Sequence, residues 1–333
     1  MYVFPDTVKE AVIRSVKLCV FSVVPSLFPF VTATRLIINF VSFDSNNSFE
    51  KFRSPFFSKA GITVFILGLV SGFPAGALLA GQGYKNGILT KNEAERISVY
   101  SSVASPSFCI IFFGGNILNN RLYGLIVYLA IVTSSLVLLS MSSFFKKEKQ
   151  TAYAETSACI PKKASASDVI ASSCITMINV CAFITFFSCI GAVLSRIFIF
   201  SGTESPFLLT LIQGIPEFTS GISAAYDLRF GQRVLTGTLL LGFGGISAIM
   251  QIYSVCESFG ISCRTLLPVR IASAPLSVFV AICYFYVYGT VKKHSVTVVV
   301  YMTFLFAIAV LFCILSKIIK ICRKKYKKSK VNF

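Results

Sequence analysis

The sequence contains no tryptophan and only one histidine, His294, among its 333 residues. This shortage removes most metal sites and excludes a Ser-His-Asp triad, because His294 falls in an expected loop. Paired intramembrane aspartates and a glycine-rich nucleotide-binding loop are also missing from the sequence. We therefore expect no enzyme, no ATP-driven pump made by this chain alone and no resident metal or cofactor.

Cysteine is frequent, with 11 residues, but no Cys-x-x-Cys pair occurs. Most of the cysteines lie inside apolar runs, where cysteine acts as a small hydrophobic residue. The cysteines thus give no indication of a redox or metal centre.

Charge is also scarce, since only 13% of residues are charged and 55% are hydrophobic. A soluble domain would carry about 25% charged residues. Six apolar runs are each about long enough to cross a bilayer as a helix: 18–41, 123–145, 169–200, 234–253, 266–288 and 296–319. Three more segments, 61–80, 103–118 and 206–225, are apolar but broken. The sequence predicts an all-α polytopic membrane protein with about 7–9 membrane segments.

The net charge of +18 could suggest a nucleic-acid partner. The basic residues gather instead in a linker, 146–163, and in a tail, 317–330. This distribution fits cytoplasmic loops and anionic headgroups, and no basic–aromatic platform accompanies it. We expect a lipid bilayer and a small molecule as partners, no nucleic acid, and leave oligomerisation open.

The chain divides into two halves with the same order of segments. We predict a first membrane repeat over 1–145, a polar basic linker over 146–168, a second membrane repeat over 169–290, and an extra membrane helix with a basic tail over 291–333. In each half a long apolar helix precedes a segment broken by glycine and proline, a second broken segment and a closing helix. Charge placement requires an odd number of crossings per half, hence inverted repeats with one re-entrant segment each.

The breaks occur at corresponding places in the two halves. They read GFPAG (72–76) and SPSFCIIFFGGN (105–116) in the first half, and GIPEFTSG (214–221) and GFGGISAIMQ (242–251) in the second. Paired broken helices indicate the binding site of a secondary transporter, because irregular backbone at membrane depth must be buried or line a cavity. The alternative is that these residues only kink helices or allow close packing.

One carboxylate, Glu217, lies within the third break. A carboxylate at membrane depth usually faces a cavity or a partner, so Glu217 is a candidate to carry a coupling proton or sodium ion. The matching position in the first half, near Ala75, has no acid. The other candidate substrate-binding or ion-binding residues are Gly72, Pro74, Gly76, Gln82, Ser105, Ser107, Asn116, Gly214, Thr219, Ser220, Gly221, Gly244, Gly245, Ser247 and Gln251.

Arg35, Arg196 and Arg270 lie in or near apolar segments. They either extend to the membrane interface or neutralise an anionic substrate. Between the first two breaks, LTKNEAERI (89–97) predicts an amphipathic helix with a capping box from Thr90 to Glu93.

The breaks and the intervening NEAER helix resemble those of the YlbJ-type sporulation integral membrane proteins, over roughly residues 12–288. Their two halves are related to the nucleoside-recognition, or Gate, domain. The resemblance implies transport linked to endospore formation in the bacterial cell membrane, with dipicolinate moved across the outer forespore membrane. The polar stretch before SPSF differs here, where SVYSSVA replaces the usual asparagines.

The hypothesis is a secondary transporter of a small polar or anionic metabolite. Two alternatives stay open: a non-transporting membrane scaffold required for spore formation, and a nucleoside transporter.

Overall fold

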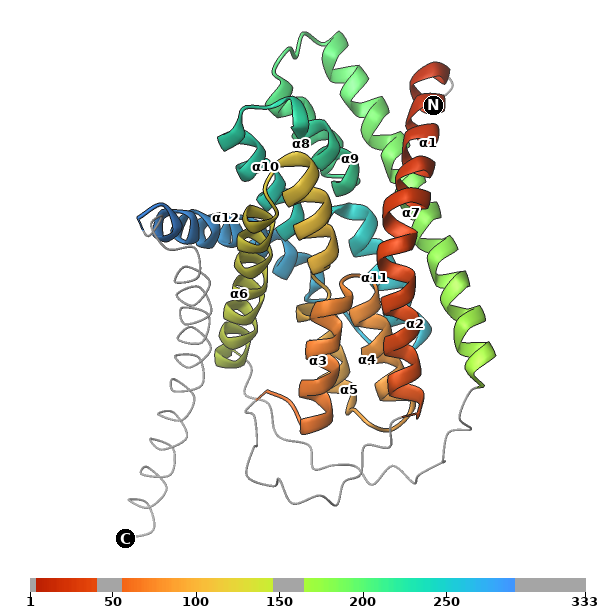
Figure 1. Cartoon of the computed structure of the whole chain (residues 1–333). Coiled ribbons are helices and arrows are strands. Elements are labelled where there is room, and N and C mark those ends of the chain that lie inside the picture. The colour runs from red at the N-terminus through yellow and green to blue at the C-terminus, as the bar shows by residue number, and fades with distance from the viewer. Residues whose placement is uncertain (1–3, 41–55, 146–164, 291–333) are drawn as a thin grey trace.

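The structure, a computed structural model, describes residues 4–40, 56–145 and 165–290. In these ranges the regular elements are helices, without a strand (Figure 1). Five are long and apolar enough to cross a membrane: Pro5–Ile37, Arg121–Ser142, Ala166–Phe200, Phe230–Ser258 and Leu266–Gly289. Lys59–Ser71 and Phe108–Ile117 are shorter apolar helices. The prediction of an all-α polytopic membrane protein is confirmed. The predicted last helix, 296–319, and most of the linker, 146–164, lie outside the described residues.

The first long helix begins earlier than the apolar run predicted. It comprises α1 (Pro5–Leu18), a π-helical turn η1 (Cys19–Val23) and α2 (Val24–Phe40). Proline at the first helical position and an acid in the first turn favour a start at Pro5. The charged residues that lowered the hydropathy of this stretch lie mostly on exposed positions of α1.

The rest of the first half forms a helical hairpin, a broken helix and a closing helix. The hairpin is α3 (Lys59–Ser71) and α4 (Ala75–Lys85), with Gly72 ending α3 at a φ of +76°. The broken helix is α5 (Lys91–Tyr100), a non-helical stretch and the π-helical η2 (Phe108–Ile117), followed by α6 (Arg121–Phe145). The predicted capping box of Thr90 and Glu93 is confirmed at the start of α5.

The second half repeats this order. It contains the long α7 (Ala166–Phe200), a hairpin of α8 (Pro206–Gly214) and α9 (Phe218–Ala224), and the short η3 (Ala225–Asp227). The broken helix α10 (Phe230–Phe243) and α11 (Gly245–Ser258) and the closing α12 (Leu266–Thr290) follow.

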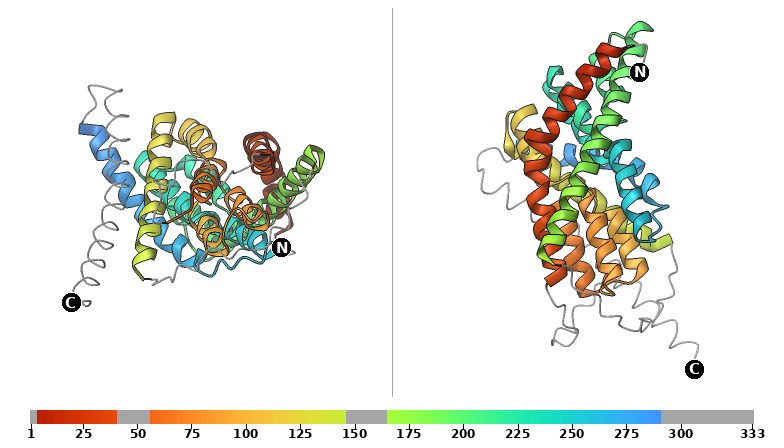
Figure 2. Two further views of the ribbon diagram at one scale, coloured as in Figure 1. Left: turned by 90° about the horizontal axis from the view of Figure 1, so that it is seen from below. Right: turned by 90° about the vertical axis from the view of Figure 1, so that its right-hand side faces the viewer.

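The two halves have opposite orientations. The hairpin α3/α4 lies at the lower end of the molecule in Figure 1, whereas α8/α9 lies at the upper end. The long helices α1–α2 and α7 pack along each other and run in opposite directions (Figures 1 and 2). On the other side α6 packs against α12, where the Thr133 and Tyr284 hydroxyls lie 2.9 Å apart. The inverted order brings all four breaks to the middle of the molecule; the predicted domain limits themselves stay a prediction.

Candidate functional site

The two breaks of the first half are joined by their backbones. The amide of Phe73 donates a hydrogen bond of 2.9 Å to the carbonyl of Val103. A Cβ atom on Gly72 would lie 2.8 Å from the backbone nitrogen of Ser105, so the close approach requires glycine. Gly76 is similarly close to Ser102. The two breaks of the first half, which are separated in sequence by α4 and α5, therefore pack directly against each other.

The second half joins its breaks in the same way. The amide of Ile246 donates to the carbonyl of Ile215, and the amide of Ser247 donates to that of Pro216, each at 2.9 Å. The turn between α10 and α11 has positive φ angles at Gly244 (+87°) and Gly245 (+74°). Part of the interrupted backbone in each break of this half is therefore hydrogen-bonded to the other break of the same half. This pairing satisfies these polar groups inside the membrane.

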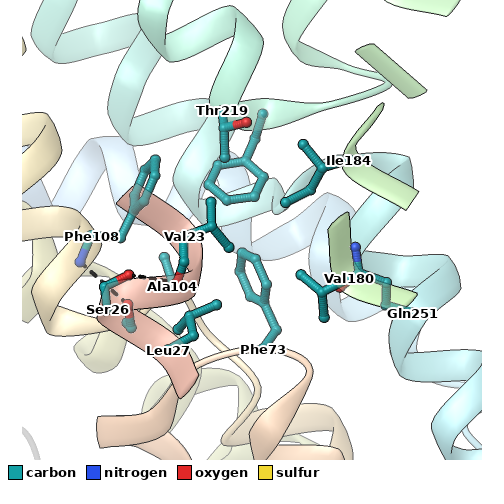
Figure 3. Close-up of a pocket in the computed structure, with 12 residues that line it drawn as sticks. Val23, Ser26, Leu27, Phe73, Ala104, Phe108, Val180, Ile184, Thr219 and Gln251 are labelled. Carbon is teal, nitrogen blue, oxygen red and sulfur yellow. Dashed lines mark hydrogen bonds between the residues drawn. The ribbon is translucent and has the colours of Figure 1, made fainter. Parts of the chain in front are cut away.

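Aromatic rings join the halves at the centre. The Phe218 ring contacts the Phe73 ring at a centroid distance of 5.1 Å and the Phe108 ring at 5.2 Å. Beside these rings lies a cavity of about 30 Å³, whose wall includes Phe73, Ser105, Thr219 and Gln251 (Figure 3). Because these residues come from all four breaks, the structure brings the predicted breaks together.

Glu217 is fully buried and caps the start of α9. Its Oε2 accepts a hydrogen bond of 2.8 Å from the Ser220 amide and another from the Thr219 hydroxyl. Its Oε1 has no hydrogen-bond partner among the described residues. An ionised carboxylate with an unpaired buried oxygen is unfavourable, so this oxygen needs a proton or a cation. In the first half Pro74 takes the corresponding capping position and gives no side-chain hydrogen bond.

Further polar side chains surround the breaks. The Ser220 and Ser188 hydroxyls lie 2.8 Å apart, linking α9 to α7. Gln251 donates through Nε2 to the hydroxyl of Ser247 at 3.1 Å, and both side chains are buried. Gln251 is the polar residue that α11 supplies to the central cavity.

Other predicted site residues serve packing or lie elsewhere. A Cβ on Gly221 would overlap Gly214, so this glycine pair allows α8 and α9 to approach closely. At these two positions glycine has the packing role that was the alternative to a binding site. Ser107 lines a neighbouring groove of about 300 Å³. Gln82 is half-buried and Asn116 is exposed, and neither lines the central cavity.

The long helices supply lining residues that sequence reasoning missed. The first helix contributes Val23, Ser26 and Leu27, and α7 contributes Val180 and Ile184. Pro25 and Pro29, inside an apolar run, could have marked the first set, because proline interrupts helical hydrogen bonding. An ordinary apolar pattern in α7 gave no such signal.

Two larger polar cavities flank the central one. A cavity of about 220 Å³ lies between α1 and the later turns of α7, and its wall includes Arg14, Arg196 and Ser220. A second, of about 260 Å³, is lined by residues that include Arg35 and Gln251. Within the described ranges, no group of three or more His, Cys, Asp or Glu side chains is placed to hold a metal ion.

Comparison with known proteins gives one distant similarity to report. No family model matches the chain, and no solved structure matches it. The chain is 26% identical over 272 residues to the "Sporulation integral membrane protein YlbJ" of Bacillus subtilis (strain 168). The match covers 70% of this chain but 66% of the relative, just under two thirds of its length. The similarity supports the resemblance to YlbJ and leaves the Gate domain a prediction. With its membrane-spanning helices, the protein is an integral membrane protein that is distantly similar to a sporulation membrane protein.

Proposed function

We propose that this protein is a secondary transporter that moves a small polar or anionic metabolite across the membrane. The observation that carries the proposal is that four helix breaks meet at a narrow centre between two polar cavities. Discontinuous helices that meet at a repeat interface are typical of transporter binding sites.

The three cavities follow one another along α7. Ser188 and Arg196 line the first, Ile184 lines the central one, and Thr176 and Asn179 line the last. With a helical rise of 1.5 Å per residue, Thr176 and Arg196 are about 30 Å apart along the helix axis. This length matches the hydrocarbon thickness of a bilayer, about 30 Å. The positions of the three cavities along α7 therefore support a route from one side of the membrane to the other.

The centre of this route is closed. A cavity of about 30 Å³ has room for little more than a water molecule, so a metabolite needs the aromatic rings to move. Rocking of one half against the other would open each outer cavity to the centre in turn. Phe73, Phe108 and Phe218 form the contact that such a motion would separate.

Charge at the outer cavities favours an anion. Arg14 and Arg196 outnumber Glu10 at one, and Arg35 lines the other without an acidic lining residue. The sporulation name of the relative and the resemblance to its type make dipicolinate, moved across the outer forespore membrane, the first substrate to test. Glu217, with its unpaired oxygen, is the proposed carrier of a coupling proton or sodium ion.

The test is uptake by purified full-length protein in liposomes. We expect accumulation of labelled dipicolinate under a proton or sodium gradient, above that of protein-free liposomes. Labelled nucleosides test the alternative substrate class in the same vesicles. If dipicolinate, nucleosides and related anions all stay outside under every gradient, the transporter proposal is wrong, and the scaffold hypothesis gains support.

A further inference from the structure

Arg35, near the end of α2, is buried, with 6% of its side chain exposed. Its Nη1 donates hydrogen bonds to the hydroxyls of Ser172 (2.9 Å) and Ser173 (3.2 Å) on α7. Its Nε is buried without a hydrogen-bond partner among the described residues. The guanidinium is thus largely enclosed by protein and is not spread over the outer surface of the helix.

A buried guanidinium normally pairs with a carboxylate, since an uncompensated charge is costly to remove from water. In the described ranges, the hydrogen bonds of Arg35 go to two neutral serines and none goes to a carboxylate. Its positive charge is therefore not balanced by these contacts. The Nε and Nη2 edge of a guanidinium offers two parallel N–H donors, which match the two oxygens of a carboxylate.

Arg35 lines the cavity of about 260 Å³, which is large enough for a small organic molecule. Further hydrogen-bonding side chains line the same cavity: Thr176, Asn179, Gln251, Ser254 and Ser258. Gln251 and Val180 also line the central cavity, so the two spaces adjoin. The lining includes no aspartate or glutamate that would repel an anion.

We propose that this cavity is an anion-binding vestibule in which Arg35 binds a carboxylate group of the ligand. Asn179 and Thr176 on α7 supply neutral hydrogen bonds that help orient the ligand. The role of the vestibule as the waiting position of the transported substrate rests on the proposed function. Binding itself does not, because it requires only the cavity and an arginine whose charge no carboxylate balances among the described residues.

Equilibrium binding to the full-length protein in detergent tests the site, with dipicolinate, glutarate and sulfate as anions and the neutral diamide of dipicolinate as a comparison. We expect anions to bind at least ten times more tightly than the diamide.

Arg35→Gln should lose at least ten-fold in anion affinity and leave diamide binding unchanged. Arg35→Lys should lose less anion affinity than Arg35→Gln, because lysine keeps the positive charge but lacks the two parallel N–H donors of a guanidinium. The matched control is Arg264→Gln, an exposed arginine outside this cavity, which should bind like the wild type.

Asn179→Asp tests the same site without altering a buried residue, since Asn179 is exposed. Its new carboxylate would add a negative charge to the lining of the same cavity, so it should repel anions and reduce their affinity by at least ten-fold. The proposal is wrong if the wild type binds none of the three anions, or if Asn179→Asp binds them unchanged. Anion binding by the wild type without uptake into liposomes would reject transport and retain the site. Uptake with binding unaffected by Asn179→Asp would reject the site and retain transport.

Discussion

The rings of Phe73 and Phe218, one from each half of the chain, meet edge to face with their planes at 85°. Phe73 lies in the first break, and Phe218 lies in the third break, where it is the first residue of α9. Both rings are at least 90% buried, and they form part of the wall of the central cavity. This contact joins corresponding breaks of the two halves and closes the route proposed for the substrate.

A smaller side chain at Phe218 should let substrate pass through the central constriction more easily. We expect Phe218→Leu to raise the rate at which preloaded dipicolinate leaves liposomes without a gradient, by several-fold, because leucine fills less of the constriction. The accumulation reached under a gradient should fall correspondingly. Efflux of labelled substrate measures both.

The control for this variant is Phe279→Leu on α12, whose ring is 65% exposed in the protein and available to lipid. It should show wild-type efflux. Equal efflux from both variants would mean that the Phe218 ring does not close the route.

Replacing Glu217 by glutamine should leave folding intact and abolish the coupling of transport to an ion gradient. The glutamine oxygen can still accept hydrogen bonds from the Ser220 amide and the Thr219 hydroxyl, so α9 keeps its cap. The amide cannot release a proton or balance a cation. We expect normal expression and thermal stability, with ion-driven accumulation lost. A variant that still accumulates substrate against a gradient would make Glu217 purely structural.

Gly245 should not tolerate a side chain. Its φ of +74° is a conformation that costs a non-glycine residue about 1–2 kcal/mol. A Cβ would also lie 3.0 Å from the backbone nitrogen of Phe218. We expect Gly245→Ala to lower the free energy of unfolding by about 1–3 kcal/mol, measured by denaturation in detergent.

The matched control is Gly231→Ala, in the first turn of α10, where an added Cβ has no neighbour within 4 Å. Alanine favours helix over glycine by up to about 1 kcal/mol, so this change should be neutral or stabilising. A Gly245 variant as stable as the Gly231 variant would contradict the tight approach of the third and fourth breaks.

The hydrogen bond between Thr133 and Tyr284 should hold the closing helices together. Tyr284→Phe removes one hydroxyl of a buried pair, and we expect a loss of about 0.6–1.5 kcal/mol in the free energy of unfolding. The exposed Tyr286→Phe is the control. In a Thr133→Val background Tyr284→Phe should have little further effect; an undiminished loss there would show that the pair contributes nothing.

The sequence allowed the breaks to be predicted because glycine and proline act on the backbone locally. Their conformations at Gly72 and Gly244 follow from residue type, as does the cap at Thr90. Distance along the chain explains why two of the candidate residues do not line the central cavity. Gln82 is eight residues beyond Pro74, about 12 Å along α4. Asn116 lies near the far end of the π-helical η2, eleven residues beyond Ser105. Both therefore lie away from the centre.

The lining from the long helices could not be predicted in this way. Val180 and Ile184 are β-branched aliphatic residues, as are the lipid-facing Ile175 and Ile178, which are 61% and 68% exposed. Only tertiary packing distinguishes the two faces of α7. Likewise, the pairing of Ile246 with Ile215 depends on how two separate segments meet, and no local pattern specifies it.

The pairing of breaks has a consequence for how the chain is assembled in the membrane. The backbone hydrogen bonds that join one break to another connect residues about thirty positions apart, within one half. The first half can therefore form its hydrogen bond from Phe73 to Val103 once the residues after α5 have been inserted, while the second half is still being synthesised. The later arrival of Phe218 adds an aromatic contact between units whose polar backbone is already paired at these bonds. Each half can therefore stay in the bilayer before it contacts the other half, because the backbone N–H and C=O groups in these bonds are not exposed to lipid.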